Sequence, residues 1–124
     1  MRFSKMLSMT VALCILLAAR LCGAADAPKY DMAPFKAIAE ETLKLLKSKD
    51  YAGAEKKILD LEEKWDDGTK LLKTADRKVW TGIDKQMDVA IDATKAAKDA
   101  AGAEKAIKEI DAFIAKLTDA EKVK

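Results

Sequence analysis

The chain has 124 residues, of which 50% are hydrophobic and 35% are charged, with a formal net charge of +2 and no histidine. Its only two cysteines, Cys14 and Cys22, lie within the first 25 residues. Beyond those residues, the sequence excludes haem or zinc ligation through histidine or cysteine, thiol redox chemistry and proton transfer by histidine.

Residues 1–25 have the features of a secretory signal peptide. A positively charged start precedes an apolar stretch of 14 residues, 6–19, which Arg20 ends. A membrane-spanning helix needs about 20 apolar residues, so this stretch is short for one. Small residues follow, and we expect cleavage after Ala25 or Ala24. The predicted location is the periplasm or the extracellular space, without stable membrane insertion; a retained anchor is the alternative.

Cleavage would change the charge of the chain. It removes three basic residues and leaves 20 basic against 21 acidic residues, a net charge of −1, with Arg77 as the only arginine. Because charges of both signs are interspersed, no basic surface for nucleic acid is expected. The cleaved chain also has no cysteine, so core packing has to hold it together without a disulfide.

The rest of the sequence predicts an all-α domain over residues 34–120, after a disordered lead at 26–33. Helices are expected at about 34–48, 51–73, 75–98 and 101–117, with Asp50 and Thr74 as N-caps of the second and third. Apolar and small side chains recur along each helix at spacings of three and four, as in helices that pack at about 20°. Because the connections are short, we predict an antiparallel four-helix bundle.

The expected core seams follow that spacing. In chain order they are Phe35, Ile38, Thr42 and Leu45, flanked by Ala39 and Leu46; Tyr51, Ala54, Ile58, Leu61, Trp65, Gly68 and Leu72; Trp80, Ile83, Met87, Ala90, Thr94 and Ala97; and Ala103, Ile107, Ile110, Ile114 and Leu117.

An internal repeat suggests that the bundle consists of two helical hairpins. Residues 49–58 read KDYAGAEKKI and residues 98–107 read KDAAGAEKAI, with eight of ten positions identical. Each copy lies where one predicted helix ends and the next begins, so its lysine would favour the outgoing helix and its aspartate would cap the incoming one. The two hairpins would be joined by residues 73–76.

Trp65 and Trp80 lie at nearly equal distances from the turn predicted near residues 72–73. Antiparallel pairing therefore places them in one layer, either as a core aromatic pair or as a pair that stacks on a ligand. Gly68 and Gly82 lie on the same two helices, and we expect them to allow close approach or to accommodate the tryptophans.

Two resemblances accompany this interpretation. Asp50, Tyr51 and Ala54 resemble the turn between the two helices of a tetratricopeptide repeat, although the spacing of 49 residues departs from that family's 34. Trp65-Asp66, followed by Trp80 and Ile83-Asp84, is similar to a pattern in small exported bacterial helical-bundle proteins of unknown function. The second resemblance implies a fold and an exported location, and it implies no activity.

The aspartates Asp84, Asp88 and Asp92 recur every fourth residue on the third predicted helix. They form either a solvated face neutralised by lysines or a weak site for a divalent metal or a cationic ligand. Calcium usually takes six to eight oxygen ligands from a shaped loop, which three carboxylates on a straight helix do not supply. We therefore predict no metal and no cofactor, and keep these three residues as the only candidates.

A second acidic group is expected to be a solvated face containing an ion pair between Asp66 and Lys70. Its members are Glu62, Glu63, Asp66 and Asp67.

The sequence contains no recognisable catalytic group, phosphate-binding loop or dinucleotide fingerprint, so we predict that the protein is not an enzyme. The expected function is a non-catalytic binding or protein-interaction role, as an adaptor, a chaperone-like factor or a sensor accessory. One alternative is a carrier of a small ligand or a divalent metal, and another is a scaffolding coiled-coil oligomer. A protein partner is expected, with the chain as a monomer or small oligomer.

Overall fold

The computed structural model describes residues 29–123, in which helices are the only regular secondary structure and no strand occurs. The predicted all-α class is confirmed, whereas the predicted signal peptide lies outside the described residues. Between residues 29 and 123, no helix is both long enough and apolar enough to cross a membrane. The helices are α2 (Ala33–Lys47), α3 (Tyr51–Ile58), α4 (Asp60–Gly68), α5 (Lys70–Ala75), α6 (Arg77–Ala96) and α7 (Ala100–Glu121).

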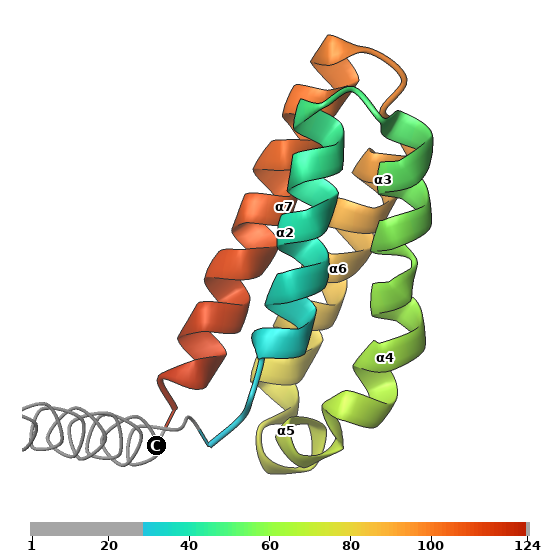
Figure 1. Cartoon of the computed structure of the whole chain (residues 1–124). Helices are drawn as coiled ribbons and strands as arrows, with labels where there is room; N and C mark the ends of the chain where they lie inside the picture. The colour runs from blue at the N-terminus through green and yellow to red at the C-terminus, as the bar shows by residue number, and fades with distance from the viewer. Residues whose placement is uncertain (1–28, 124) are drawn as a thin grey trace, which may run out of the picture.

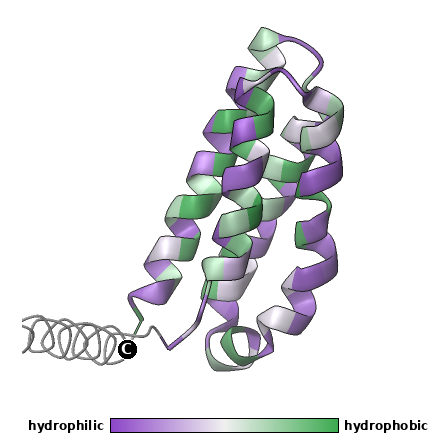
Figure 2. Ribbon diagram, in the orientation of Figure 1, coloured by the Kyte–Doolittle hydropathy of each residue, from purple (hydrophilic) through white to green (hydrophobic). Residues whose placement is uncertain are grey.

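Figure 1 shows α2, the α3–α4 segment, α6 and α7 lying along a common axis. The chain reverses direction between α2 and α3, between α4 and α6, and between α6 and α7, so α2 and α6 rise in this view while α3–α4 and α7 descend. Both α2 and α6 pack against α3 and against α7, and the short α5 packs against α6 at the lower end. Hydrophobic residues concentrate on the faces that these helices turn toward one another (Figure 2).

The helix predicted over 51–73 is interrupted twice in the structure, giving α3, α4 and α5. The second interruption lies at Thr69, whose hydroxyl donates to the backbone carbonyl of Trp65, directly after Gly68. A hydroxyl bonded to the preceding turn and a glycine both weaken a regular helix, which accounts for the break. Apart from half-buried Tyr51 and exposed Gly68, the predicted stripe stays buried along all three helices.

The predicted seam of α6 is confirmed, because all six of its residues are buried. The seam predicted for α7 is partly wrong. Ile107 and Ile114 are only half-buried, and Ala106 and Phe113 occupy the core positions instead. The physical reason is aromatic packing, since Phe113 places its ring next to Trp65 and the two isoleucines then flank the core. The helix also continues beyond its predicted end at residue 117 to Glu121.

The beginning of the described chain is also more ordered than expected. Tyr30 and Met32 fall in the predicted disordered lead, yet their side chains are 7% and 2% exposed and belong to the core. Within α2, Leu46 rather than Leu45 takes the fully buried position, which shifts the seam by one residue at its upper end.

The two copies of the repeated segment begin α3 and α7 with the same cap. Asp50 accepts from the backbone N–H of Gly53 at 3.0 Å, and Asp99 accepts from that of Gly102 at 2.8 Å. The preceding turns differ, because Lys49 has a positive φ of 65° and no other non-glycine residue between 29 and 123 does. The predicted Asp50 cap is thus confirmed.

The predicted N-cap at Thr74 is wrong. Asp76 caps α6 by accepting from the backbone N–H of Val79 at 3.1 Å, while the Thr74 hydroxyl donates to the carbonyl of Lys70 within α5. The extra short helix α5 explains the shift, because it moves the start of α6 two residues along the chain.

The two glycines on facing helices provide a matched test of packing. A Cβ added to Gly68 would lie 2.7 Å from Cζ of Phe35, whereas one added to Gly82 would meet nothing within 4 Å. Gly68 therefore makes room for Phe35 rather than for a tryptophan. We expect Gly82→Ala to stabilise the protein by up to about 1 kcal/mol through helix propensity. Gly68→Ala should destabilise it by about 1–3 kcal/mol because Phe35 has to move.

Urea unfolding of both variants, followed by circular dichroism, measures these changes. A stabilised Gly68→Ala variant would contradict the close contact between Gly68 and Phe35.

Candidate functional site

The centre of the lower half is an aromatic cluster around Trp65 of α4. Its ring stacks on Trp80 of α6, with centroids 6.1 Å apart and planes at 22°. Phe35 of α2 and Phe113 of α7 approach it edge-on at centroid distances of 5.2 and 6.3 Å. The tryptophans are 1% and 8% exposed. The predicted juxtaposition of the two tryptophans is confirmed, and they form a buried pair within the core.

A chain of hydrogen bonds links this cluster to the break between α4 and α5. The indole N–H of Trp80 donates to the hydroxyl oxygen of Thr69 at 2.8 Å, and that hydroxyl donates to the carbonyl of Trp65. The Lys73 ammonium lies 4.4 Å from the centroid of the Trp80 ring, in cation–π range. Thr69 is itself 2% exposed, so its hydroxyl satisfies polar groups that water does not reach.

The indole N–H of Trp65 is buried and has no hydrogen bond of normal geometry within residues 29–123. The acidic group whose charged form this N–H favours is the carboxyl of Asp84, on α6. The pKa of Asp84 is raised above 3.8, first because burial disfavours the charged form and then because Asp88 and Asp66 add negative charge. The Trp65 N–H and the Lys73 ammonium oppose this rise.

The three aspartates of the acidic stripe on α6 differ in their exposure. Asp84 is half-buried, whereas Asp88 and Asp92 are exposed. In the described part of the chain, no group of three or more metal-ligating side chains of the acidic, histidine or cysteine type comes together. None of the three aspartates forms an ion pair with a described residue, and the Lys73 ammonium lowers the pKa of Asp84 without pairing with it.

The second acidic group is solvent-exposed on α4, as its sequence predicts. The predicted ion pair is wrong in its partner, because the Lys70 ammonium lies 3.3 Å from the carboxylate of Asp67 rather than pairing with Asp66. The break at Thr69 changes the helical register between α4 and α5, so that the third residue back, and not the fourth, faces Lys70. The negative charge of Asp66 instead contributes to the raised pKa of Asp84.

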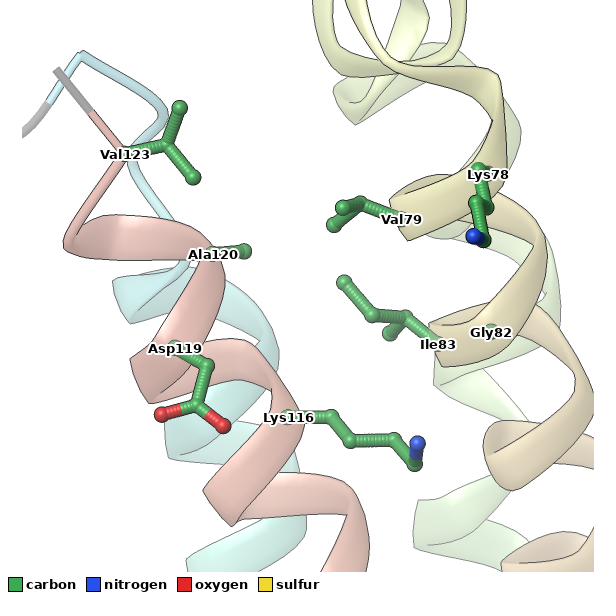
Figure 3. Close-up of a pocket in the computed structure, with 8 residues that line it drawn as sticks. All are labelled: Lys78, Val79, Gly82, Ile83, Lys116, Asp119, Ala120 and Val123. Atoms are coloured by element: carbon green, nitrogen blue, oxygen red, sulfur yellow. The ribbon is translucent and has the colours of Figure 1, made fainter.

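A groove that sequence reasoning missed lies between the start of α6 and the end of α7, with a volume of about 490 Å³. Figure 3 shows Val79 and Ile83 pointing from α6 toward Ala120 on α7, with the side chain of Lys116 extending across the opening. The groove is lined by Lys78, Val79, Gly82, Ile83, Lys116, Asp119, Ala120 and Val123. The sequence offered one signal for this groove, namely Gly82. Because glycine has no side chain, it leaves space at the surface of the helix that another residue would occupy.

The lower end of the molecule also exposes apolar surface around α5. Leu71 is 76% exposed, the highest value among the large hydrophobic residues described. Beside it lies a hollow of about 250 Å³, to which Tyr30, Met32 and Leu72 contribute apolar side chains. We call Leu71 together with this hollow the α5 end surface. Sequence reasoning missed it because the break that forms α5 was not expected.

Comparisons of the chain with known protein families, with characterised proteins and with solved structures find no match. The resemblances to tetratricopeptide turns and to small exported bacterial bundles therefore stay predictions from sequence.

The hydroxyl of Thr69 has a measurable structural role. Thr69→Val keeps the shape of the side chain but leaves the buried Trp80 N–H without an acceptor, so we expect a loss of about 1–3 kcal/mol in stability. Thr74→Val is the control, because Thr74 makes the same hydroxyl bond to the fourth carbonyl back but is exposed. That variant should change stability by less than about 0.5 kcal/mol. Equal effects in thermal or urea unfolding would refute the role of Thr69.

Asp84→Asn should stabilise the protein at pH 7 and not at pH 3. A carboxyl with a raised folded pKa binds protons more readily when folded, so its charge destabilises the fold above that pKa and the penalty disappears below 3.8. Removing its repulsion with Asp88 is expected to add a few tenths of a kcal/mol, about 0.3–0.5. Urea unfolding at both pH values measures the difference, with exposed Asp111→Asn as the control. The same gain at pH 3 would contradict this origin.

Proposed function

We propose that the protein is an exported, antiparallel four-helix bundle with a non-catalytic protein-interaction role in the periplasm or outside the cell. In this proposal α3, α4 and α5 together act as one broken helix, and the chain forms two helical hairpins. The reversals of chain direction after α2, after α4 and after α6, together with the buried seams, support the architecture. The signal-like residues 1–25 support export.

The α5 end surface carries the proposal of a protein partner. A single exposed leucine is ordinary on a protein surface, but Leu71 borders a hollow with apolar walls, so an incoming side chain could bury both together. Lys29 and Asp31, the charged residues that line this hollow, provide its charged rim. Burying one leucine contributes roughly 1.5–3 kcal/mol, which is enough to give an interface its central anchor.

Site-specific photo-crosslinking tests this role. A photo-reactive amino acid at position 71 should form an adduct with a partner protein in the exported fraction. The same amino acid at position 111, an exposed site in the middle of α7, should not. The partner, once identified by mass spectrometry and purified, should bind the Leu71→Gln variant about tenfold or more weakly than the original protein, since that is the minimum expected for losing the buried leucine.

Circular dichroism should show that Leu71→Gln is folded, because exposed substitutions usually change stability by less than about 0.5 kcal/mol. No adduct from position 71, or unchanged binding of the purified partner by Leu71→Gln, would refute the α5 end surface as the interaction site. An adduct containing only a second copy of this chain would favour the scaffolding oligomer instead.

A further inference from the structure

The groove between α6 and α7 has the size and lining of a small-molecule site. Its volume of about 490 Å³ falls within the range of about 300–1,000 Å³ in which ligand pockets occur. Ile83 and Ala120, which are almost fully buried, form its floor, and the half-buried Val79 and Val123 form its sides. An apolar body of several methylene groups would therefore contact carbon atoms on both helices.

The charges around the groove favour an anionic head group. Lys78 and Lys116 are exposed at its rim, and neither forms an ion pair with any residue between 29 and 123. Asp119 is the only acidic lining residue, and its carboxylate lies 3.7 Å from the ammonium of Lys122. The groove lies between the N-terminal end of α6, which has a partial positive charge, and the C-terminal end of α7, which has a partial negative charge. These partial charges offset each other, so the two lysines give the groove a positive electrostatic potential.

We propose that this groove binds a small aliphatic carboxylate, with its carbon chain between Val79 and Val123 and its carboxylate near Lys78 and Lys116. The inference is independent of the proposed protein-interaction role, because the groove shares no lining residue with the α5 end surface.

Gly82 allows a charge of either sign to be introduced into the groove. It lies one turn after Lys78 on α6, it lines the groove, and a side chain added there would meet nothing within 4 Å. Lysine and glutamate have nearly equal helix propensities, both better than that of glycine. Gly82→Lys and Gly82→Glu should therefore both remain folded, while they place opposite charges at the rim of the groove.

Sodium octanoate is the probe, and octan-1-ol, which has the same chain length without the charge, is its control. Titration into the isotopically labelled protein, followed by amide NMR, should shift signals from residues 78–83 and 116–123. The affinity should increase from hexanoate to octanoate by up to about fourfold for each added methylene group, the factor that corresponds to burying one such group. Octan-1-ol should bind more weakly than octanoate.

The variants then test the lysines. We expect Lys78→Gln combined with Lys116→Gln to weaken octanoate binding at least threefold and to leave octan-1-ol binding unchanged. Gly82→Glu should weaken octanoate binding, and Gly82→Lys should preserve or strengthen it. Lys105→Gln, at an exposed position on α7 outside this groove, should have no effect.

Several results would overturn the proposal. These are the absence of localised NMR shifts, equal affinities for octanoate and octan-1-ol, and equal effects of Gly82→Glu and Gly82→Lys. Shifts confined to the α5 end surface would place the ligand elsewhere. None of these results depends on whether a protein partner crosslinks at position 71, so either proposal can fail without the other.

Discussion

One side chain, Trp65, connects all the long segments of this protein. It projects from α4 and contacts an aromatic ring from α2, one from α6 and one from α7. Aromatic pairs of this kind add about 0.5–1.5 kcal/mol beyond the burial of their surface. The described part of the chain contains no cysteine, so packing around this ring, and not a disulfide, has to hold these helices together. The positions of α4, α6 and the lower half of α7 all follow from the requirement to surround this ring.

The same requirement explains the irregular path of the chain from α4 to α6. The chain has to leave α4 after Gly68 and bring Trp80 back onto the face of Trp65, 15 residues along the chain. Thr69 makes this compatible with burial, because its hydroxyl both accepts from the Trp80 indole and donates to the Trp65 carbonyl. Gly68 leaves the space that Phe35 fills. In the resulting short helix α5, Leu71 faces solvent and the next residue, Leu72, is buried.

Much of this fold follows from spacing alone. The all-α class, the seam of α6, the facing tryptophans and the Asp50 cap were predictable because each depends on residues close in sequence or on simple antiparallel pairing. What could not be predicted depends on tertiary contacts. The choice of Phe113 over Ile114 for the core requires knowing where Trp65 lies, and the burial of Tyr30 requires knowing where α5 ends. For the groove, Gly82 was the one signal in the sequence, and it was not enough, because the shape of the groove also depends on how α6 and α7 pack against each other.

The stacking of both tryptophans in one cluster affects how the stability of this protein can be observed. The chain has two tryptophans, and both lie in the lower half, so their fluorescence reports on that end only. The upper end contains the caps at Asp50 and Asp99 and the 3.3 Å ion pair between Lys98 and Glu55, and its nearest chromophore is the half-buried Tyr51. Cooperative unfolding of the whole bundle therefore has to be established with a second probe, such as far-ultraviolet circular dichroism. A bundle that opens first at its upper end would be invisible to its own tryptophans.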